Sequence, residues 1–239
     1  MAGAKDITVK VIPSRIAVDF IKKHHYSGKV VNNSVLHFGA FLDGRLHGVM
    51  SFGSPLDKRK VIGLVVDRNG NPVPWNDMLE LNRMAFDDVL PTNSESRCIA
   101  VAIRLIRKNA PNIKWILSFA DGTQCGDGTI YRASGFALTD IRGNKNTCRM
   151  PDGSVLHKMT LESNPTTPRD DLGGASYYGI TNGRYDFQYF CKAMNAEVLE
   201  GFQLRYVKIL DPRYHLAVPE IPYSEITARG AGMYKGEKR

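Results

Sequence analysis

The chain has 239 residues, of which 43% are hydrophobic, and its formal net charge is +8. No apolar run approaches the roughly 20 residues that cross a bilayer, and the start, MAGAKDITVK, lacks the apolar core of a signal peptide, so we expect an intracellular protein without a membrane span. Most of the positive charge lies in residues 1–60, which favours a polyanionic partner, most commonly nucleic acid.

The first part of the chain predicts strands interrupted by one helix. That helix is expected to begin at Pro13-Ser14, with Ser14 as its N-cap, and to end after Lys22 and Lys23, because cations suit the last turn of a helix. Strands are predicted from alternation or apolar runs at residues 6–12, in the hairpin 35–53 around Asp43-Gly44, at 61–66 and at 79–86.

A long helix and a central strand follow. Thr92 and Glu95 have the spacing of a capping box, and the apolar stripe after them indicates a helix that Pro111 stops. The continuous apolar run 113–119 is typical of a central strand. Beyond a glycine-rich loop, a short helix and a strand are predicted at 131–136 and 136–142.

The last third of the chain is less regular. A second hairpin is expected in 147–161, around Asp152-Gly153, and the composition of 163–185 indicates an exposed excursion. A helix at 186–202, a strand at 205–210 and a loose basic tail from Ala228 complete the predicted elements.

This order of elements predicts an α/β (α+β) fold, with a mixed central sheet and helices on both sides. We expect a core at 1–161 and a C-terminal extension at 162–239, made of a loop, a helix, a strand and the basic tail, that packs on the core.

The four cysteines stand far apart, without the paired spacing of a zinc site. Free thiols are expected for Cys98, Cys148 and Cys191, because free cysteine is commonly buried as a small apolar residue. Cys125 differs because it lies on the glycine-rich loop, beside Gln124, directly after the central strand.

The element order and the segment YRASGF resemble the GNAT-type acyltransferases, in which a strand leads to a helix that carries a tyrosine and ends in Gly-Phe. Tyr131, Gly135 and Phe136 match this pattern, and the fold resemblance covers about residues 6–160. The resemblance implies a GNAT-like catalytic core that binds an activated acyl donor.

One departure from that family concerns the donor. Acetyl-CoA-dependent members have a glycine-rich loop before the long helix, where backbone amides approach the pyrophosphate. Here that segment is PTNSESR and has no glycine. Ser94, Ser96 and Arg97 can still contact a phosphate, but coenzyme A in its usual pose is not expected.

Three longer segments give a more specific resemblance. KHHYSGKVVNNSVLHFGAF, ELNRMAFDDVLPTNSESRCIA and LSFADGTQCGDGTIYRASGF are similar to the Mom family of Mu-like phages. The resemblance implies an enzyme that converts adenine in double-stranded phage DNA to N6-carbamoylmethyladenine in the cytoplasm of the infected bacterium. This modification protects the DNA from restriction enzymes. The resemblance also points to Arg83, Ser96, Asp121 and Tyr131 as activity-related positions.

A DNA-adenine transferase has to expose the base, take a proton from its exocyclic amine and bind a donor. Asp121, expected at the carboxyl end of the central strand, is a candidate to hold the amine and accept its proton, or else caps the next turn. Tyr131 is a candidate proton donor or base-stacking ring, or else a packed aromatic residue.

Asn82 and Arg83 lie in an apolar strand. A buried arginine is costly unless it is paired, so Arg83 is expected to hold a phosphate or carboxylate, or to pair with an acid such as Asp121. The residues expected to contact the donor are Asn82, Ser94, Arg97, Ser118, Gln124 and Cys125. An acyl-accepting role for Cys125 is a minor alternative, since nothing basic is adjacent in sequence.

His24, His25 and Tyr26 end the first helix. His25 and Tyr26 are catalytic candidates, with a general base, a phosphate contact or an iron ligand as roles for a histidine, and a solvated basic helix end as the alternative. Adjacent histidines point in different directions, so joint binding of one metal by His24 and His25 is not expected. Iron has no support from ligand spacing.

The product that the resemblance implies bears on the donor. Its CH2-CO-NH2 group has two carbons and one nitrogen, which match a glycyl unit, so glycyl-tRNA is favoured over acetyl-CoA. Phosphate contacts to nucleic acid are expected from Lys22, Lys23, Lys58, Arg59 and Lys60.

Two rival functions remain at this stage. One is a CoA-dependent N-acetyltransferase of a small amine or a protein, which needs no DNA. The other is a non-catalytic basic DNA-binding protein on the same scaffold, whose binding would survive loss of Asp121. The sequence leaves the oligomeric state open, a dimer included.

Overall fold

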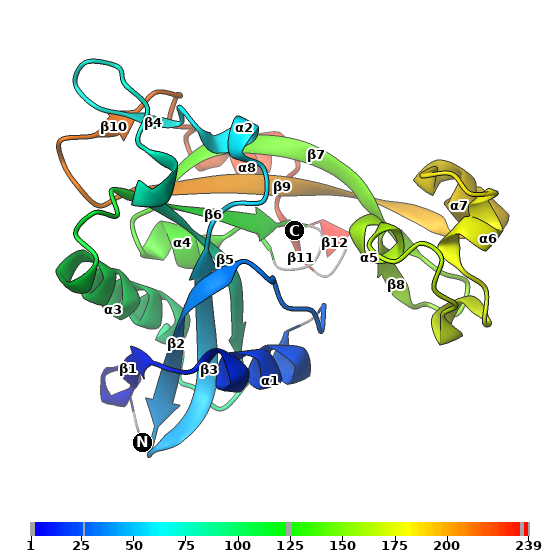
Figure 1. Ribbon diagram of the computed structural model, residues 1–239, viewed down its shortest axis with the longest axis horizontal. Coiled ribbons are helices and arrows are strands. Elements are labelled where there is room, and N and C mark those ends of the chain that lie inside the picture. Colours follow the sequence, from blue (N-terminus) through cyan, green and yellow to red (C-terminus); the bar gives the residue numbers. More distant parts are fainter. Residues whose placement is uncertain (1–2, 26, 123–125, 235–236, 239) are drawn as a thin grey trace. The chain divides into compact units, whose positions relative to one another are not determined.

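The structure is a computed structural model that describes residues 3–25, 27–122, 126–234 and 237–238 (Figure 1). The chain forms two compact units that interleave along the sequence. Unit 1 comprises Met1–Ala120, Gly128–Asp140 and Leu204–Glu225, and unit 2 comprises Asp121–Asp127, Ile141–Gln203 and Ile226–Arg239. The division into domains at residue 161 stays a prediction.

Eight strands follow one another in the order β1-β2-β3-β5-β6-β9-β7-β8. The pairs β1–β2, β2–β3, β3–β5 and β7–β8 are antiparallel, whereas β5 and β6 are parallel and are connected through helix α3. This mixed sheet with flanking helices confirms the predicted fold class. The strands are β1 (Thr8–Val11), β2 (Ser34–Leu42), β3 (Arg45–Gly53), β5 (Met78–Phe86), β6 (Trp115–Asp121), β7 (Ala137–Arg149), β8 (Val155–His157) and β9 (Glu197–Ile209).

The helices of unit 1 pack on this sheet with the apolar faces that their sequences indicate. Ala17 and Ile21 of α1 pack with Val49 of β3 and Ala85 of β5, because apolar residues four apart share one face of a helix. Helix α3 contacts β1 and α4. These helices are α1 (Ser14–His24), α2 (Lys58–Val61), α3 (Ser94–Asn109) and α4 (Thr129–Ala133).

Unit 2 has its own apolar core. Cys148, Leu161, Tyr177, Phe190 and Cys191 are buried together in it, and the free thiols of Cys98, Cys148 and Cys191 agree with the sequence prediction. Its helices are α5 (Lys158–Glu162), α6 (Tyr177–Thr181) and α7 (Phe187–Ala193), and α8 (Ser224–Ala228) follows in the C-terminal part. Two small strand pairs join β4 (Val65–Val66) to β10 (His215–Leu216) and β11 (Met233–Tyr234) to β12 (Glu237–Lys238). No helix in the described parts of the chain has the length and apolar character to cross a membrane.

Two element predictions are wrong because local turns interrupt the patterns. Only Val65–Val66 of the expected strand 61–66 is a strand, since Asp57 caps α2 by accepting from the Arg59 amide and Gly63 then turns with φ +88°. The expected helix 186–202 ends at Ala193, because Asn195 has φ +52° and the chain enters β9 at Glu197.

Both predicted helix starts are also one residue off or wrongly capped. Pro13, not Ser14, is the N-cap of α1. Asn93, at φ +68°, is the N-cap of α3, so the capping box of Thr92 and Glu95 does not form.

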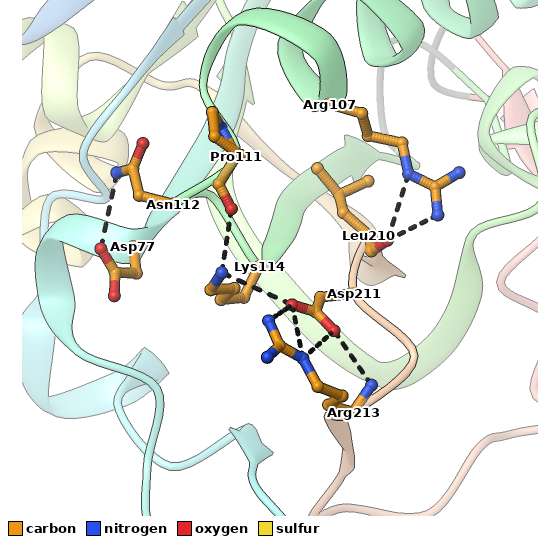
Figure 2. Close-up of polar contacts among 8 residues, drawn as sticks. All are labelled: Asp77, Arg107, Pro111, Asn112, Lys114, Leu210, Asp211 and Arg213. Carbon is orange, nitrogen blue, oxygen red and sulfur yellow. Dashed lines mark hydrogen bonds and ion pairs between the residues drawn. The ribbon is translucent and has the colours of Figure 1, made fainter.

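Charged residues fasten the end of β9 to the turn between α3 and β6 (Figure 2). Arg107 donates from Nε and Nη2 to the Leu210 carbonyl oxygen, at 3.1 and 2.6 Å. Lys114 Nζ donates to the Pro111 carbonyl oxygen at 2.9 Å and lies 3.4 Å from an Asp211 carboxylate oxygen. The carboxylate also accepts from Arg213, and these contacts hold the pKa of Asp211 well below its usual range. In the same turn, Asn112 Nδ2 lies 3.5 Å from Asp77 Oδ1.

Replacement of Asp211 by Asn is expected to lower the free energy of unfolding by about 1–2 kcal/mol near pH 7. Because the folded pKa is depressed, the carboxylate contributes its full stabilisation above its ordinary pKa of 3.8, and loses it as the pH falls toward the folded value. Urea titrations of both proteins at pH 7 and pH 2.5 measure this. A difference that stays constant with pH would contradict it, and Arg213→Ala, whose side chain is 69% exposed, serves as the milder control.

Candidate active site

Strand β5 changes its pairing in the middle of the sheet. The parallel ladder joins Met78–Leu81 to Trp115–Ser118, and the buried Ser118 hydroxyl donates to the Leu81 carbonyl oxygen at 3.0 Å. On the other edge, the register with β3 passes from Leu81 directly to Arg83, so Asn82 is the extra residue of a β-bulge. Bulges re-aim side chains, and this one sits where the parallel ladder ends.

The half-buried guanidinium of Arg83 is held by main-chain oxygens. Nε donates to the Lys29 carbonyl oxygen at 3.0 Å, and Nη1 donates to the Asn82 carbonyl oxygen at 2.9 Å. Within the described part of the chain, Nη2 makes no hydrogen bond. The cation is therefore fixed in place with one nitrogen available to an anion or a carbonyl oxygen.

Two titratable groups lie within the electrostatic reach of Arg83. Burial raises the pKa of Glu80 to about 7, although the Arg83 charge opposes that rise. Burial lowers the pKa of His25 to about 4, and the Arg83 charge adds to that fall. At neutral pH, Glu80 therefore exchanges its proton readily and the imidazole of His25 is neutral.

Ser27 sets the tautomer of that imidazole. The Ser27 amide donates to His25 Nδ1 at 3.1 Å, and the Ser27 hydroxyl lies 2.8 Å from the same atom. Because Nδ1 accepts, the neutral ring carries its proton on Nε2. His25 thus suits hydrogen-bond donation better than proton abstraction.

Unpaired polar atoms mark the same region. The Ser34 hydroxyl donates to Asn82 Oδ1 at 2.9 Å, which leaves Asn82 Nδ2 buried without a partner in the described structure. Asn33 Oδ1 is likewise buried and unpaired. A buried polar atom without a hydrogen bond costs about 1–3 kcal/mol, so such atoms in a native protein call for a binding partner.

The structure thus brings together three predicted residues, His25, Asn82 and Arg83, with Ser118 one strand away. Sequence reasoning missed Glu80, although an acid inside the apolar strand LELNRMAF is the same signal that singled out Arg83. Asn33 and Ser34 were missed because nothing local to NNS distinguishes a site from a turn.

The predicted phosphate contacts at the start of α3 are largely engaged with their own turn. The buried Ser94 hydroxyl donates to the Pro91 carbonyl oxygen, and the Ser96 hydroxyl donates to the Asn93 carbonyl oxygen at 3.2 Å. Arg97 Nη2 donates to the Lys5 carbonyl oxygen at 3.1 Å, while its buried Nε has no partner among the described residues.

The segment YRASGF forms the end of α4. The Phe136 amide donates to the Tyr131 carbonyl oxygen, and the Gly135 amide donates to that of Arg132, which is a Schellman motif with Gly135 at φ +71°. The Tyr131 ring is buried, with its centroid 5.6 Å from that of Phe136 and 5.2 Å from that of Tyr206. Packing therefore explains much of this motif.

The other predicted residues are spread over the chain. Asp121 is the half-buried last residue of β6 and falls in unit 2, whereas Gln124, Cys125 and Tyr26 lie outside the described residues. His24 stacks on Phe20, with ring centroids 4.3 Å apart. The part of the chain that the structure describes contains no cluster of three or more His, Cys, Asp or Glu side chains suited to a metal ion. Lys22, Lys23, Lys58, Arg59 and Lys60 are all exposed.

Comparison with known proteins places the chain in a family. Residues 6–225 match the model of the Mom protein family. The methylcarbamoylase Mom of Escherichia phage Mu is 38% identical over 165 residues, which make up 67% of this chain but only 64% of that relative's length.

Among solved structures, a GNAT family acetyltransferase from Elizabethkingia anophelis with acetyl-CoA bound is 13% identical, with 86% of this chain and 99% of that chain covered and a TM-score of 0.43. The ribosomal-protein-S18-alanine N-acetyltransferase of Escherichia coli is 10% identical, with coverage of 86% and 94% and a TM-score of 0.42. Likenesses this distant say nothing about the ligands of this chain. On the family match, the chain belongs to the Mom protein family.

Proposed function

We propose that this protein modifies phage DNA, converting adenine in double-stranded DNA to N6-carbamoylmethyladenine, and that it protects the DNA from restriction in the cytoplasm of the infected host. Membership of the Mom family and the name of the Mu relative support this function. The observation that carries the chemistry is the cluster of Glu80, Arg83 and His25, which sets a near-neutral carboxyl group beside a fixed cation.

The cluster supplies the steps of an acyl transfer. The adenine N6 amine attacks the acyl carbon of the donor, and Glu80 accepts the proton that the amine loses, since a base with a pKa near the working pH is most effective. Arg83 Nη2 hydrogen-bonds the carbonyl oxygen that becomes negative. Asp121 and Tyr131 keep their predicted roles as proposals, Asp121 as the group that holds N6 and Tyr131 as the donor of a proton to the leaving group.

A glycyl donor accounts for every atom of the product. The N6 nitrogen first displaces the tRNA hydroxyl from the glycyl ester and forms N6-glycyladenine. The free glycyl amine then attacks adenine C6, the C6–N6 bond breaks, and the former N6 becomes the amide nitrogen of the CH2-CO-NH2 group. No oxidant or reductant is needed. Glycyl-tRNA is accordingly the proposed donor, which makes tRNA a proposed partner.

The start of α3 fits the pyrophosphate of coenzyme A poorly. The hydroxyls of Ser94 and Ser96 are used within the turn, and Glu95 adds a negative charge to the first turn of the helix. Arg97 remains as a cation for a single phosphate. This arrangement favours a donor that does not depend on a pyrophosphate cradle.

Nucleoside mass spectrometry of plasmid DNA from cells that express the protein, grown on glycine labelled at carbon and nitrogen, tests this function. A modified deoxyadenosine that carries both labels is expected. A modified nucleoside without the glycine nitrogen would keep DNA modification and discard the glycyl donor. Unmodified plasmid with a folded, DNA-binding protein would leave the non-catalytic alternative.

The exposed lysines at the end of α1 are expected to contribute more to DNA binding than the basic residues of α2. Arg59 and Lys60 lie 3.6 and 3.3 Å from Asp57 carboxylate oxygens, which neutralise part of their charge, whereas Lys22 and Lys23 form no ion pair with the described residues. Salt titrations of DNA binding measure the difference. Replacing Lys22 and Lys23 by Ala should reduce the log–log salt slope by about 0.9 for each phosphate that the variant no longer neutralises.

The matched variant with Ala at Arg59 and Lys60 should change that slope less. An equal or larger change in the α2 variant would contradict the assignment.

A further inference from the structure

A cavity of about 170 Å³ lies beside α1, and no step described above uses it. Its lining comes from α1, from the segment 30–34 and from the β2–β3 hairpin. Val18, Ile21, Val30 and Val31 form the apolar part, and the polar part consists of Ser14, Asn32, Ser34, His37 and Ser51. No lining residue carries a formal charge unless His37 is protonated, so the cavity suits a neutral ligand better than a phosphate or a carboxylate.

A buried polar pair belongs to this lining. His37 and Ser51 face each other in the ladder between β2 and β3, and His37 Nδ1 lies 2.8 Å from Ser51 Oγ. Their exposures are 6% and 1%. Burial lowers the pKa of His37, so its ring is neutral at physiological pH and offers both a donor and an acceptor.

Ser34 connects the cavity with the Arg83 cluster. It lines the cavity, and its hydroxyl donates to Oδ1 of Asn82, a side chain that is 9% exposed and whose Nδ2 is unpaired among the described residues. The unpaired acceptor Asn33 Oδ1 precedes Ser34 directly. One buried donor and one buried acceptor therefore lie next to a neutral cavity.

Adenine has the complementary edge. A ring nitrogen accepts and the N6 amine beside it donates, which is why carboxamide side chains pair with adenine. A cavity of about 150 Å³ is known to hold a benzene ring, so the present volume suits an aromatic ring. An enzyme that acts on a base of a duplex has to take that base out of the stack into a pocket.

We propose that this cavity receives the extruded adenine, with Asn82 Nδ2 donating to a ring nitrogen and Asn33 Oδ1 accepting from the N6 amine. The proposal rests on the proposed function and deepens it, because Asn82 adjoins Arg83 and so brings N6 to the acyl-transfer cluster. Lys22 and Lys23 follow Ile21 on α1 and are exposed, where they can hold the flanking phosphates.

Binding of 9-methyladenine to the full chain, followed by ligand-observed NMR, tests the pocket independently of catalysis. Val18→Phe fills the cavity and should weaken binding at least about tenfold. Ile16→Phe adds a similar bulk on the same helix at a residue that is 44% exposed and does not line the cavity, and should bind like the wild type. Asn82→Asp retains the acceptor for Ser34 but loses the donor, and should also weaken binding about tenfold.

Plasmid modification by the same variants separates the two proposals. If binding depends on Val18 and Asn82 but the wild type makes no modified adenine, the pocket stands and the proposed function fails. The pocket is overturned if the wild type does not bind 9-methyladenine at millimolar concentration. It is also overturned if folded Val18→Phe or Asn82→Asp protein binds the base and modifies plasmid DNA like the wild type.

Discussion

Replacement of Glu80 by Gln is expected to lower the rate of adenine modification at least about 100-fold, while the protein still folds and binds DNA. The amide has nearly the same shape as the carboxyl group but cannot accept the proton from N6. Since burial raises the pKa of Glu80 to about 7, the wild-type rate should rise with pH through about 7 as the carboxyl group ionises. The residual rate of the variant should lack this limb.

The measurement is single-turnover modification of DNA between pH 5.5 and 9, read by nucleoside mass spectrometry. Asp121→Asn is the informative comparison, because Asp121 is the other candidate proton acceptor. If Asp121→Asn removes the pH limb and Glu80→Gln retains it, the assignment to Glu80 is wrong. Asp88→Asn, which alters an exposed carboxylate just past β5, should leave both rate and profile unchanged.

Local signals in the sequence are enough for the elements whose hydrogen bonds are local. YRASGF forms a Schellman motif because Gly135 can adopt the left-handed conformation and Phe136 packs back on Tyr131. The β2–β3 hairpin forms around Asp43 and Gly44, both at positive φ, as the Asp-Gly signal predicts. In these cases, the residues that decide the structure are neighbours in the chain.

The helix predicted at 186–202 failed for a complementary reason. The apolar residues of 186–193 do form a helix, but Val198 and Leu199 continue in β9, where the sheet supplies their backbone partners. A strand end that lacks its own pattern is decided by tertiary pairing, which outweighs a weak helical propensity.

The site needed contacts between distant segments. Ser34 and Asn82 are 48 residues apart, and Lys29 and Arg83 are 54 apart, yet these bonds fix the bulge and the guanidinium. The unusual pKa of Glu80 arises from burial beside Gly53 of β3 and Leu117 of β6. Arg83 was identified from the sequence because a charge in an apolar strand is visible there. The identity of its neighbours was not, since only the folded register supplies them.

Replacement of Arg83 by Gln is expected to lower the modification rate by about 100- to 1000-fold, the usual loss for a group that stabilises a developing oxyanion. It should also move two titrations in known directions. The Arg83 charge favours the ionised form of Glu80 and the neutral form of His25, so its removal raises the pKa of Glu80 above about 7 and raises that of His25 above about 4.

Arg83→Lys separates charge from geometry. Lysine keeps the cation, so the pH limb should stay near 7, but it cannot donate to the Lys29 and Asn82 carbonyl oxygens in the same planar arrangement, and the rate should still fall. The pH–rate profile and an NMR titration of His25 measure these effects. If the limb stays near 7 in Arg83→Gln, the guanidinium does not act on Glu80. The cluster would then be a structural clamp of the bulge rather than the place where adenine loses its proton.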